Sequence, residues 1–149
     1  MLRLYNTATR KVEDFKPINE NKVGIYVCGL TVYTDMHLGH ERTYIAFDVI
    51  RRWFEHLGYE VNFVQNHTDI DDKIINRANE EEISSKDLAN KYIERTTEDL
   101  ESLQVHHPSH MPKATDYIPE IIEIISDLIA KNHAYVTETA LGSLASDVN

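Results

Sequence analysis

Apolar and polar positions along the chain follow two periods, one typical of strands and one typical of helices. Residues 22–27 alternate and are rich in β-branched and aromatic side chains, which predicts a strand. From Gly39 to Leu57, apolar residues recur three and four positions apart, which predicts a helix that Gly58 ends. Residues 61–65 return to the strand pattern. This order predicts a βαβ unit with two parallel strands and a right-handed crossover.

Three further helices are predicted downstream. One begins near Asp71, and the next covers residues 84–103, where Ser84 and Asp87 have the spacing of a cap pair. The last covers residues 116–131 and has a proline in its first turn, where a missing N–H costs little. Together with the parallel strands, these helices predict an α/β fold. The last helix is expected to bury one face, formed by Ile118, Ile121, Ile122, Ile125, Leu128 and Ile129.

The composition is that of a globular domain with an acidic balance. Of the 149 residues, 42% are hydrophobic and 27% are charged, which are ordinary values, and the length predicts one domain with a single core. The formal net charge is −10, and most of the acidic excess follows residue 58. Because no basic stripe is present, charge argues against strong polynucleotide binding by this segment alone.

Several features bear on the location of the protein. No stretch approaches 18 apolar residues, so no membrane span is expected. Residues 1–6 lack the apolar core of a secretory signal. The single cysteine, Cys28, cannot form an internal disulfide. Together these observations predict a reducing, cytoplasmic location.

Polar segments follow both predicted strands of the βαβ unit. In an open parallel sheet, ligands bind beyond the carboxyl ends of the strands, where residues 28–40 and 66–69 fall. We therefore expect the two segments to line one crevice. In the first, His37 and His40 flank Gly39 at the start of the helix. Two rings on one face, free backbone N–H groups and the helix dipole suit a phosphate, and the glycine allows a ligand to come close.

Other candidate residues have more than one interpretation. Cys28 is either a small core side chain, a thiolate metal ligand or a nucleophile. The acidic residues between 69 and 72 could hold a cation, although acids at a helix start more often cap it. The histidines between 106 and 110 are interleaved with a proline, and we expect a surface loop there rather than a metal cluster.

Three motifs, taken together, resemble cysteinyl-tRNA synthetase, a class I aminoacyl-tRNA synthetase. They are Tyr-Val-Cys-Gly at 26–29, His-Leu-Gly-His at 37–40, which is similar to the HIGH signature, and Thr-Asp-Ile-Asp-Asp-Lys-Ile-Ile at 68–75. Other nucleotidylyl-transferring enzymes share the second motif, but the three in this order and spacing are specific. The resemblance runs from Leu2 to about Val136 and implies a Rossmann-like parallel sheet followed by helices.

The resemblance also implies a reaction and an ATP site. The reaction is the ATP-dependent activation of cysteine to cysteinyl-adenylate, with Mg accompanying ATP, followed by transfer to the cysteine tRNA. His37 and His40 are then the catalytic residues that stabilise the phosphates, and Gly39 lies with them in the ATP site.

The amino acid and a zinc ion are implied by other positions of the resemblance. Gly29, Thr31 and Thr68 match positions around the bound amino acid, and Cys28 matches one thiolate ligand of a zinc ion that binds the substrate sulfur. A thiophilic metal suits this task because cysteine and serine are nearly isosteric, so that a pocket alone discriminates poorly.

The resemblance further implies how the chain is organised. Residues 1–137 are expected to form the N-terminal half of the catalytic nucleotide-binding domain, up to the start of the connective insertion, and residues 138–149 are left as an unassigned tail. The remaining zinc ligands, the KMSKS loop and most tRNA contacts are expected downstream, so the chain is interpreted as a truncated portion. Two alternatives stay open: a non-catalytic remnant that binds nucleotide or a partner, and a related ligase that joins cysteine to an amino sugar.

Overall fold

The computed structural model describes residues 2–137 and 141–143. By its internal contacts the chain divides into two compact units, an N-terminal unit, Met1–Pro112, and a C-terminal unit, Lys113–Asn149. No helix in the described ranges is both long enough and apolar enough to cross a membrane.

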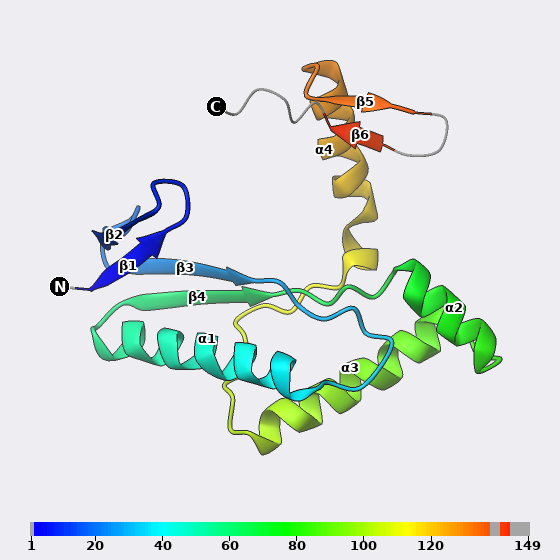
Figure 1. The fold of residues 1–149 in the computed structure, drawn as a ribbon, viewed down its shortest axis with the longest axis horizontal. Coiled ribbons are helices and arrows are strands. Elements are labelled where there is room, and N and C mark those ends of the chain that lie inside the picture. Colours follow the sequence, from blue (N-terminus) through cyan, green and yellow to red (C-terminus); the bar gives the residue numbers. More distant parts are fainter. Residues whose placement is uncertain (1, 138–140, 144–149) are drawn as a thin grey trace. The chain divides into compact units, whose positions relative to one another are not determined.

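A strand–helix–strand unit forms the centre of the N-terminal unit (Figure 1). Strand β3 (Lys22–Val27) pairs in parallel with β4 (Glu60–Gln65), and helix α1 (Leu38–His56) connects them and contacts both. Gly58 ends the turn after α1 with a φ of +87°, a conformation that glycine adopts at little cost. The predicted βαβ unit is therefore confirmed, with boundaries within one residue of those expected for both strands.

Two helices with side-chain caps follow β4. Helix α2 (Asp72–Glu80) is capped by Asp71, and α3 (Ser85–Ser102) is capped by Ser84, which also bonds the side chain of Asp87. The cap pair predicted from its spacing is thus confirmed. The two helices pack on each other and on the chain that follows β3, in a cluster formed by Val32, Ile74, Ala78, Leu88, Ala89 and Tyr92.

A second core cluster joins the sheet to two helices. Val27 and Phe63 come from β3 and β4, Tyr44 comes from α1, and Leu100 comes from the last turn of α3. All four side chains are at least 94% buried, so this cluster fixes α1 and α3 on the sheet.

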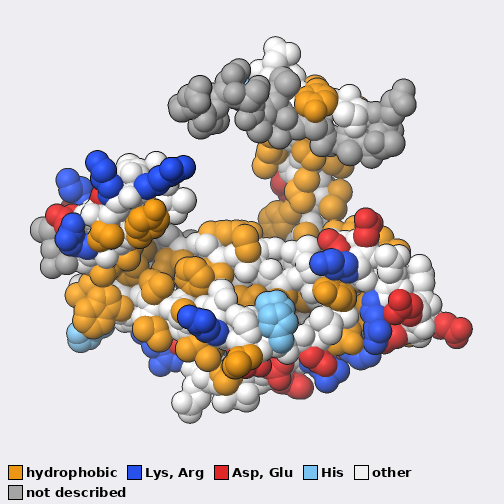
Figure 2. Space-filling model, in the orientation of Figure 1, with side chains coloured by type: hydrophobic (Ala, Val, Ile, Leu, Met, Phe, Trp, Pro, Cys, Tyr) orange, Lys and Arg blue, Asp and Glu red, His pale blue; other side chains and the backbone are white. Residues whose placement is uncertain are grey.

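Helix α1 also carries apolar side chains that the described residues of the N-terminal unit leave exposed. Among its residues, all of which are described, Tyr44, Asp48 and Phe54 are buried. Val49 and Trp53, which lie one turn apart, are 59% and 50% exposed. Figure 2 shows hydrophobic side chains open on the surface of the N-terminal unit. Helical spacing therefore identified the helix but not which of its apolar residues are buried.

An N-terminal hairpin precedes the parallel strands and was not predicted. Strands β1 (Arg3–Asn6) and β2 (Lys11–Asp14) pair antiparallel. Phe15, directly after β2, packs edge-on against the rings of Phe54 and Tyr59, at 4.9 and 6.2 Å between centroids. These aromatic contacts attach the base of the hairpin to the end of α1.

The C-terminal unit contains a helix and a short hairpin. The 3-10 helix η1 (Ala114–Tyr117) leads into α4 (Ile118–Ala130), and β5 (Ala134–Val136) pairs antiparallel with β6 (Leu141–Ser143). Strand β6 lies within the tail 138–149, whose other residues lie outside the described part of the chain.

The predicted buried face of α4 is wrong. Every residue of this helix is described, and none is buried. Ile125 and Ile129 are half-buried. Periodicity shows which side chains share a face, but burial also requires a surface that packs against that face. The large apolar residues of α4 exposed by more than a third are Ile118, Ile121, Ile122, Ile124 and Leu128.

Candidate functional site

The polar segments that follow β3 and β4 lie side by side. Thr31 and Thr68 form a parallel bridge. The Thr68 N–H donates to the carbonyl of Leu30 at 3.0 Å, and the Val32 N–H donates to the carbonyl of Thr68 at 3.2 Å. The two segments therefore lie next to each other, as parallel topology predicts. This brings together Thr31 and Thr68, two of the residues predicted to surround the bound amino acid.

Gly29 and Asn66 make the closest approach between these segments. The Gly29 N–H donates to Oδ1 of Asn66 at 2.9 Å, and Nδ2 of Asn66 donates to Oγ1 of Thr68 at 3.2 Å. A Cβ added at Gly29 would lie 1.5 Å from the Asn66 carbonyl oxygen, so only glycine fits here. Asn66 was not among the predicted site residues, although its position directly after a strand and its side chain with both a donor and an acceptor were a usable signal.

The two histidines form a cap at the start of α1. His37 is the N-cap residue, and its Nδ1 accepts a hydrogen bond from the Gly39 N–H at 3.1 Å. Nδ1 of His40 accepts in turn from the His37 N–H at 3.4 Å. The rings stack with 3.6 Å between centroids and 19° between planes. The predicted juxtaposition of the two rings is thus observed.

Two details differ from the expected phosphate cradle. The Gly39 N–H is not free, because the His37 ring accepts its hydrogen bond. A Cβ at Gly39 would lie 2.9 Å from Cε1 and 3.0 Å from Nδ1 of His37. The glycine therefore makes room for the His37 ring, and not for a ligand as predicted from the sequence.

The capping bonds determine which ring nitrogens are left to act on a ligand. Because each Nδ1 accepts a hydrogen bond, each neutral ring carries its proton on Nε2. Two Nε2–H donors therefore accompany the N-terminus of a 19-residue helix, whose dipole favours negative charge. This arrangement can donate hydrogen bonds to an anion.

The pKa of His40 leads to a prediction about pH. Burial, and secondarily the charge of His37, lowers the pKa of His40 below its ordinary value of 6.5. The unfolded chain therefore binds a proton at His40 more readily than the folded chain does. The contribution of His40 to the free energy of unfolding is complete above pH 6.5 and is lost as the pH falls through the pKa of the folded state. We expect urea unfolding at pH 7.5 and pH 5 to show this loss, and His40→Asn to reduce the difference between the two pH values. An unchanged difference in His40→Asn would contradict the assignment.

Cys28 follows β3 directly and is exposed, which excludes the interpretation as a core side chain. The pKa of Tyr44 rises to about 12 because the tyrosine is buried and, secondarily, because of the charge of Cys28. In the described part of the chain, no group of three His, Cys, Asp or Glu residues could hold a metal ion.

Asp71 and the histidines between 106 and 110 have structural interpretations: the first caps a helix, and the others lie in a surface loop. Asp71 caps α2 by accepting a hydrogen bond from the Lys73 N–H at 2.9 Å. His106, His107 and His110 are exposed, and the segment that holds them has no helix or strand of its own. The surface loop predicted there is confirmed.

Comparison with known families identifies the class of protein to which the chain belongs. The family model described as tRNA synthetases class I (C) catalytic domain matches residues 14–149. The chain belongs to this family. The match includes the tail 138–149, so the prediction that the resemblance ends near Val136 is wrong.

Curated relatives give the particular protein to which the chain is similar. A cysteine–tRNA ligase of Methanococcus maripaludis strain C6 is 54% identical over 141 residues, which are 95% of this chain and 30% of the relative. The cysteine–tRNA ligase of Aquifex aeolicus is 54% identical over 92% of this chain and 28% of its own length. That of Haemophilus influenzae strain PittGG is 49% identical over 99% and 32%. The chain therefore spans about 30% of the length of these relatives.

Proposed function

We propose that this chain supplies the N-terminal part of the catalytic site of a cysteine–tRNA ligase. The observation that carries the proposal is that two groups of candidate ligand-binding residues occur at the carboxyl end of one parallel strand pair. One is the stacked pair His37 and His40 at the start of α1, and the other is the Gly29–Asn66–Thr68 cluster. Family membership and the cysteine–tRNA ligase relatives support it. Residues 1–137 are then the first half of the catalytic domain, up to the start of the connective insertion.

The histidine pair serves the activation step. The carboxylate of cysteine attacks the α-phosphate of ATP, pyrophosphate leaves, and cysteinyl-adenylate forms. Negative charge on the phosphate oxygens is met by the Nε2–H groups of His37 and His40 and by the positive end of α1. Mg²⁺ enters with ATP as part of the substrate. The adenylate then reacts with the 3′ end of the cysteine tRNA, which is bound mainly by other parts of the protein.

The cluster on the other segment holds the amino acid. Gly29, Thr31 and Thr68 are the proposed contacts. Oγ1 of Thr68 already accepts a hydrogen bond from Asn66, so its own proton is available to donate. Asn66 thereby sets the direction in which this hydroxyl can act on a substrate.

The described residues do not form a zinc site by themselves. A zinc site in a protein uses three or four protein ligands, whereas this part of the chain offers one exposed thiol and no cluster of ligands around it. We therefore assign no step of the reaction to zinc. Cys28 is proposed as one ligand, and the others would come from the part of the relatives' length that this chain does not span.

Replacing Cys28 tests the ligand role in the full-length product of the gene that encodes this chain. We expect Cys28→Ser to lower the zinc content measured by atomic absorption and to weaken cysteine binding, because a serine hydroxyl is a poor ligand for zinc. Tyr26→Phe, at an exposed position of β3 two residues before Cys28, is the control and should retain its zinc. Equal zinc content in the two variants would refute the ligand role.

The proposed function is tested by cysteine-dependent exchange between ATP and pyrophosphate. The full-length gene product is assayed with cysteine and with serine, and then with cysteine tRNA or an amino sugar as the acceptor. Exchange with cysteine, followed by charging of the tRNA, supports the proposal. Transfer to the amino sugar instead would identify the related ligase. Absence of exchange would favour the non-catalytic alternative.

A further inference from the structure

The chain that follows α3 lies along the outer edge of β4. We call residues 104–112 the edge segment. Val64 and His110 form a parallel bridge, so the segment continues the sheet beyond β4 although it is not a strand. The Phe63 carbonyl accepts from the N–H groups of Ser109 and His110 at 2.7 and 3.3 Å, and the Gln65 N–H donates to the His110 carbonyl at 3.1 Å. Just after β4, the His67 N–H donates to the Pro112 carbonyl at 2.8 Å.

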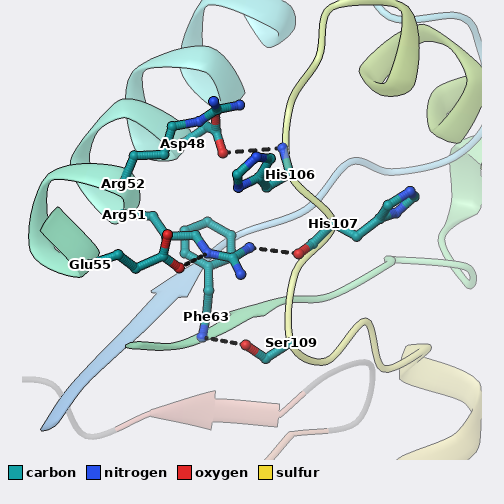
Figure 3. Close-up of polar contacts among 8 residues, drawn as sticks. All are labelled: Asp48, Arg51, Arg52, Glu55, Phe63, His106, His107 and Ser109. Carbon is teal, nitrogen blue, oxygen red and sulfur yellow. Dashed lines mark hydrogen bonds and ion pairs between the residues drawn. The ribbon is translucent and has the colours of Figure 1, made fainter. Parts of the chain in front are cut away.

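Helix α1 holds the same edge segment through charged side chains (Figure 3). Nη1 of Arg51 donates to the carbonyl of His107 at 2.6 Å. A carboxylate oxygen of Asp48 accepts from the His106 N–H at 3.1 Å. Arg52 donates both to Asp48 and to the carbonyl of Gln104. Three successive contacts thus join one face of α1 to the backbone of the segment.

Burial and charge strengthen these hydrogen bonds between α1 and the edge segment. Asp48 is 6% exposed, and its carboxylate is satisfied by the guanidinium of Arg52 and by a backbone amide. Arg51 lies over the ring of Phe63, with 5.7 Å from Cζ to the centroid, and its Nε bonds Glu55 at 2.9 Å. Hydrogen bonds with one charged partner are shorter and stronger than neutral ones, so they fix the backbone that they reach.

The edge segment continues into the proposed amino-acid site. The carbonyl of Pro112 holds the N–H of His67, which lies between Asn66 and Thr68. These two neighbours make the contacts to Gly29 and to the chain after β3. Fixing the segment therefore fixes residues 66–68 from the side opposite to β3.

We propose that Arg51 is a positioning residue for the amino-acid side of the site, and that it acts through the edge segment. This inference rests on the proposed function for its effect on the reaction. Arg51 touches none of the proposed substrate contacts. It reaches residues 66–68 through residues 107–112, which it bonds directly, and it also packs on Phe63 of β4.

The test compares Arg51→Ala with Arg77→Ala in the full-length gene product. Both arginines bond a glutamate four residues later through Nε, but only Arg51 also bonds the edge segment. Hydrogen exchange followed residue by residue should show the amides of Gln65 and His67 exchanging about tenfold faster in Arg51→Ala and unchanged in Arg77→Ala. The amides between β3 and β4 should keep their protection in both variants. Equal protection of His67 in the two variants would overturn the proposal.

Kinetics supply a readout that general loss of stability would not produce. We expect Arg51→Ala to raise the KM for cysteine about tenfold, with the KM for ATP within twofold of the parent value, and Arg51→Lys to recover most of the loss. A rise in both KM values, or no recovery by lysine, would count against positioning. If the parent protein shows no cysteine-dependent exchange, the proposed function fails, and the hydrogen-exchange comparison still decides whether Arg51 holds residues 66–68.

Discussion

A Gly29→Ala variant is expected to lose about 3 kcal/mol of its free energy of unfolding, at the upper end of the usual cost of overpacking. The added Cβ would lie 1.5 Å from the carbonyl oxygen and 2.7 Å from the carbonyl carbon of Asn66. Both are backbone atoms, so no rotation of a side chain can relieve the clash, and the segments after β3 and β4 must separate. Urea unfolding measures the loss of stability, and cysteine-dependent exchange should fall with it.

Gly24→Ala is the matched control for this variant. Gly24 lies on β3, and a Cβ added there meets no atom within 4 Å. Its free energy of unfolding should stay within about 0.5 kcal/mol of the parent value. If both variants were equally stable, the close approach between Gly29 and Asn66 would be wrong.

The second large effect is expected from His40→Ala. The variant loses an Nε2–H donor for phosphate and the acceptor for the His37 N–H, so the rate of the exchange reaction should fall about 100-fold. The fall should be mainly in kcat, because the donor acts on charge that develops during the reaction. Steady-state ATP–pyrophosphate exchange measures both kcat and KM.

Two further variants separate capping from chemistry. His40→Asn can still accept the hydrogen bond from the His37 N–H, so it should recover stability more than rate. His56→Ala changes a histidine at the opposite end of α1 and should leave the rate within twofold. A rate for His40→Ala within threefold of the parent would contradict a catalytic role for this residue.

Local signals were sufficient for the elements that position the site. The alternation at 22–27, the glycine after α1 and the Ser84 cap each depend on residues close in sequence, and each was placed correctly. The parallel pairing then followed from the length of the crossover. The meeting of residues 28–40 with residues 66–69 needed only the rule that parallel strands end at the same edge.

Contacts between residues far apart in the sequence could not be predicted from such local signals. The edge segment contains Pro108 and Pro112 and has no strand pattern, yet it pairs with β4 through residues more than forty positions away. Asp48 reads as one more polar position on a helix, and only the fold shows that it is buried against residue 106. For α4, the spacing defined a face but gave no information about what packs on it.

For Gly29 and Gly39, the sequence likewise could not identify the neighbouring group that each glycine accommodates. A glycine in a candidate site suggests a close approach, but the sequence does not say to what. At Gly29 the approaching group is the backbone of Asn66, and at Gly39 it is the ring of His37. In both positions the space serves the protein's own geometry.

The edge segment also has a consequence for the order in which the chain folds. Strands β3 and β4 can pair as soon as α1 connects them, but residues 66–68 obtain their outer partner only when the chain after α3 has returned to β4. These contacts need residues that are synthesised well after β4, so they cannot form until the edge segment is available. During synthesis, the amino-acid side of the site is thus completed after the two strands from which it extends.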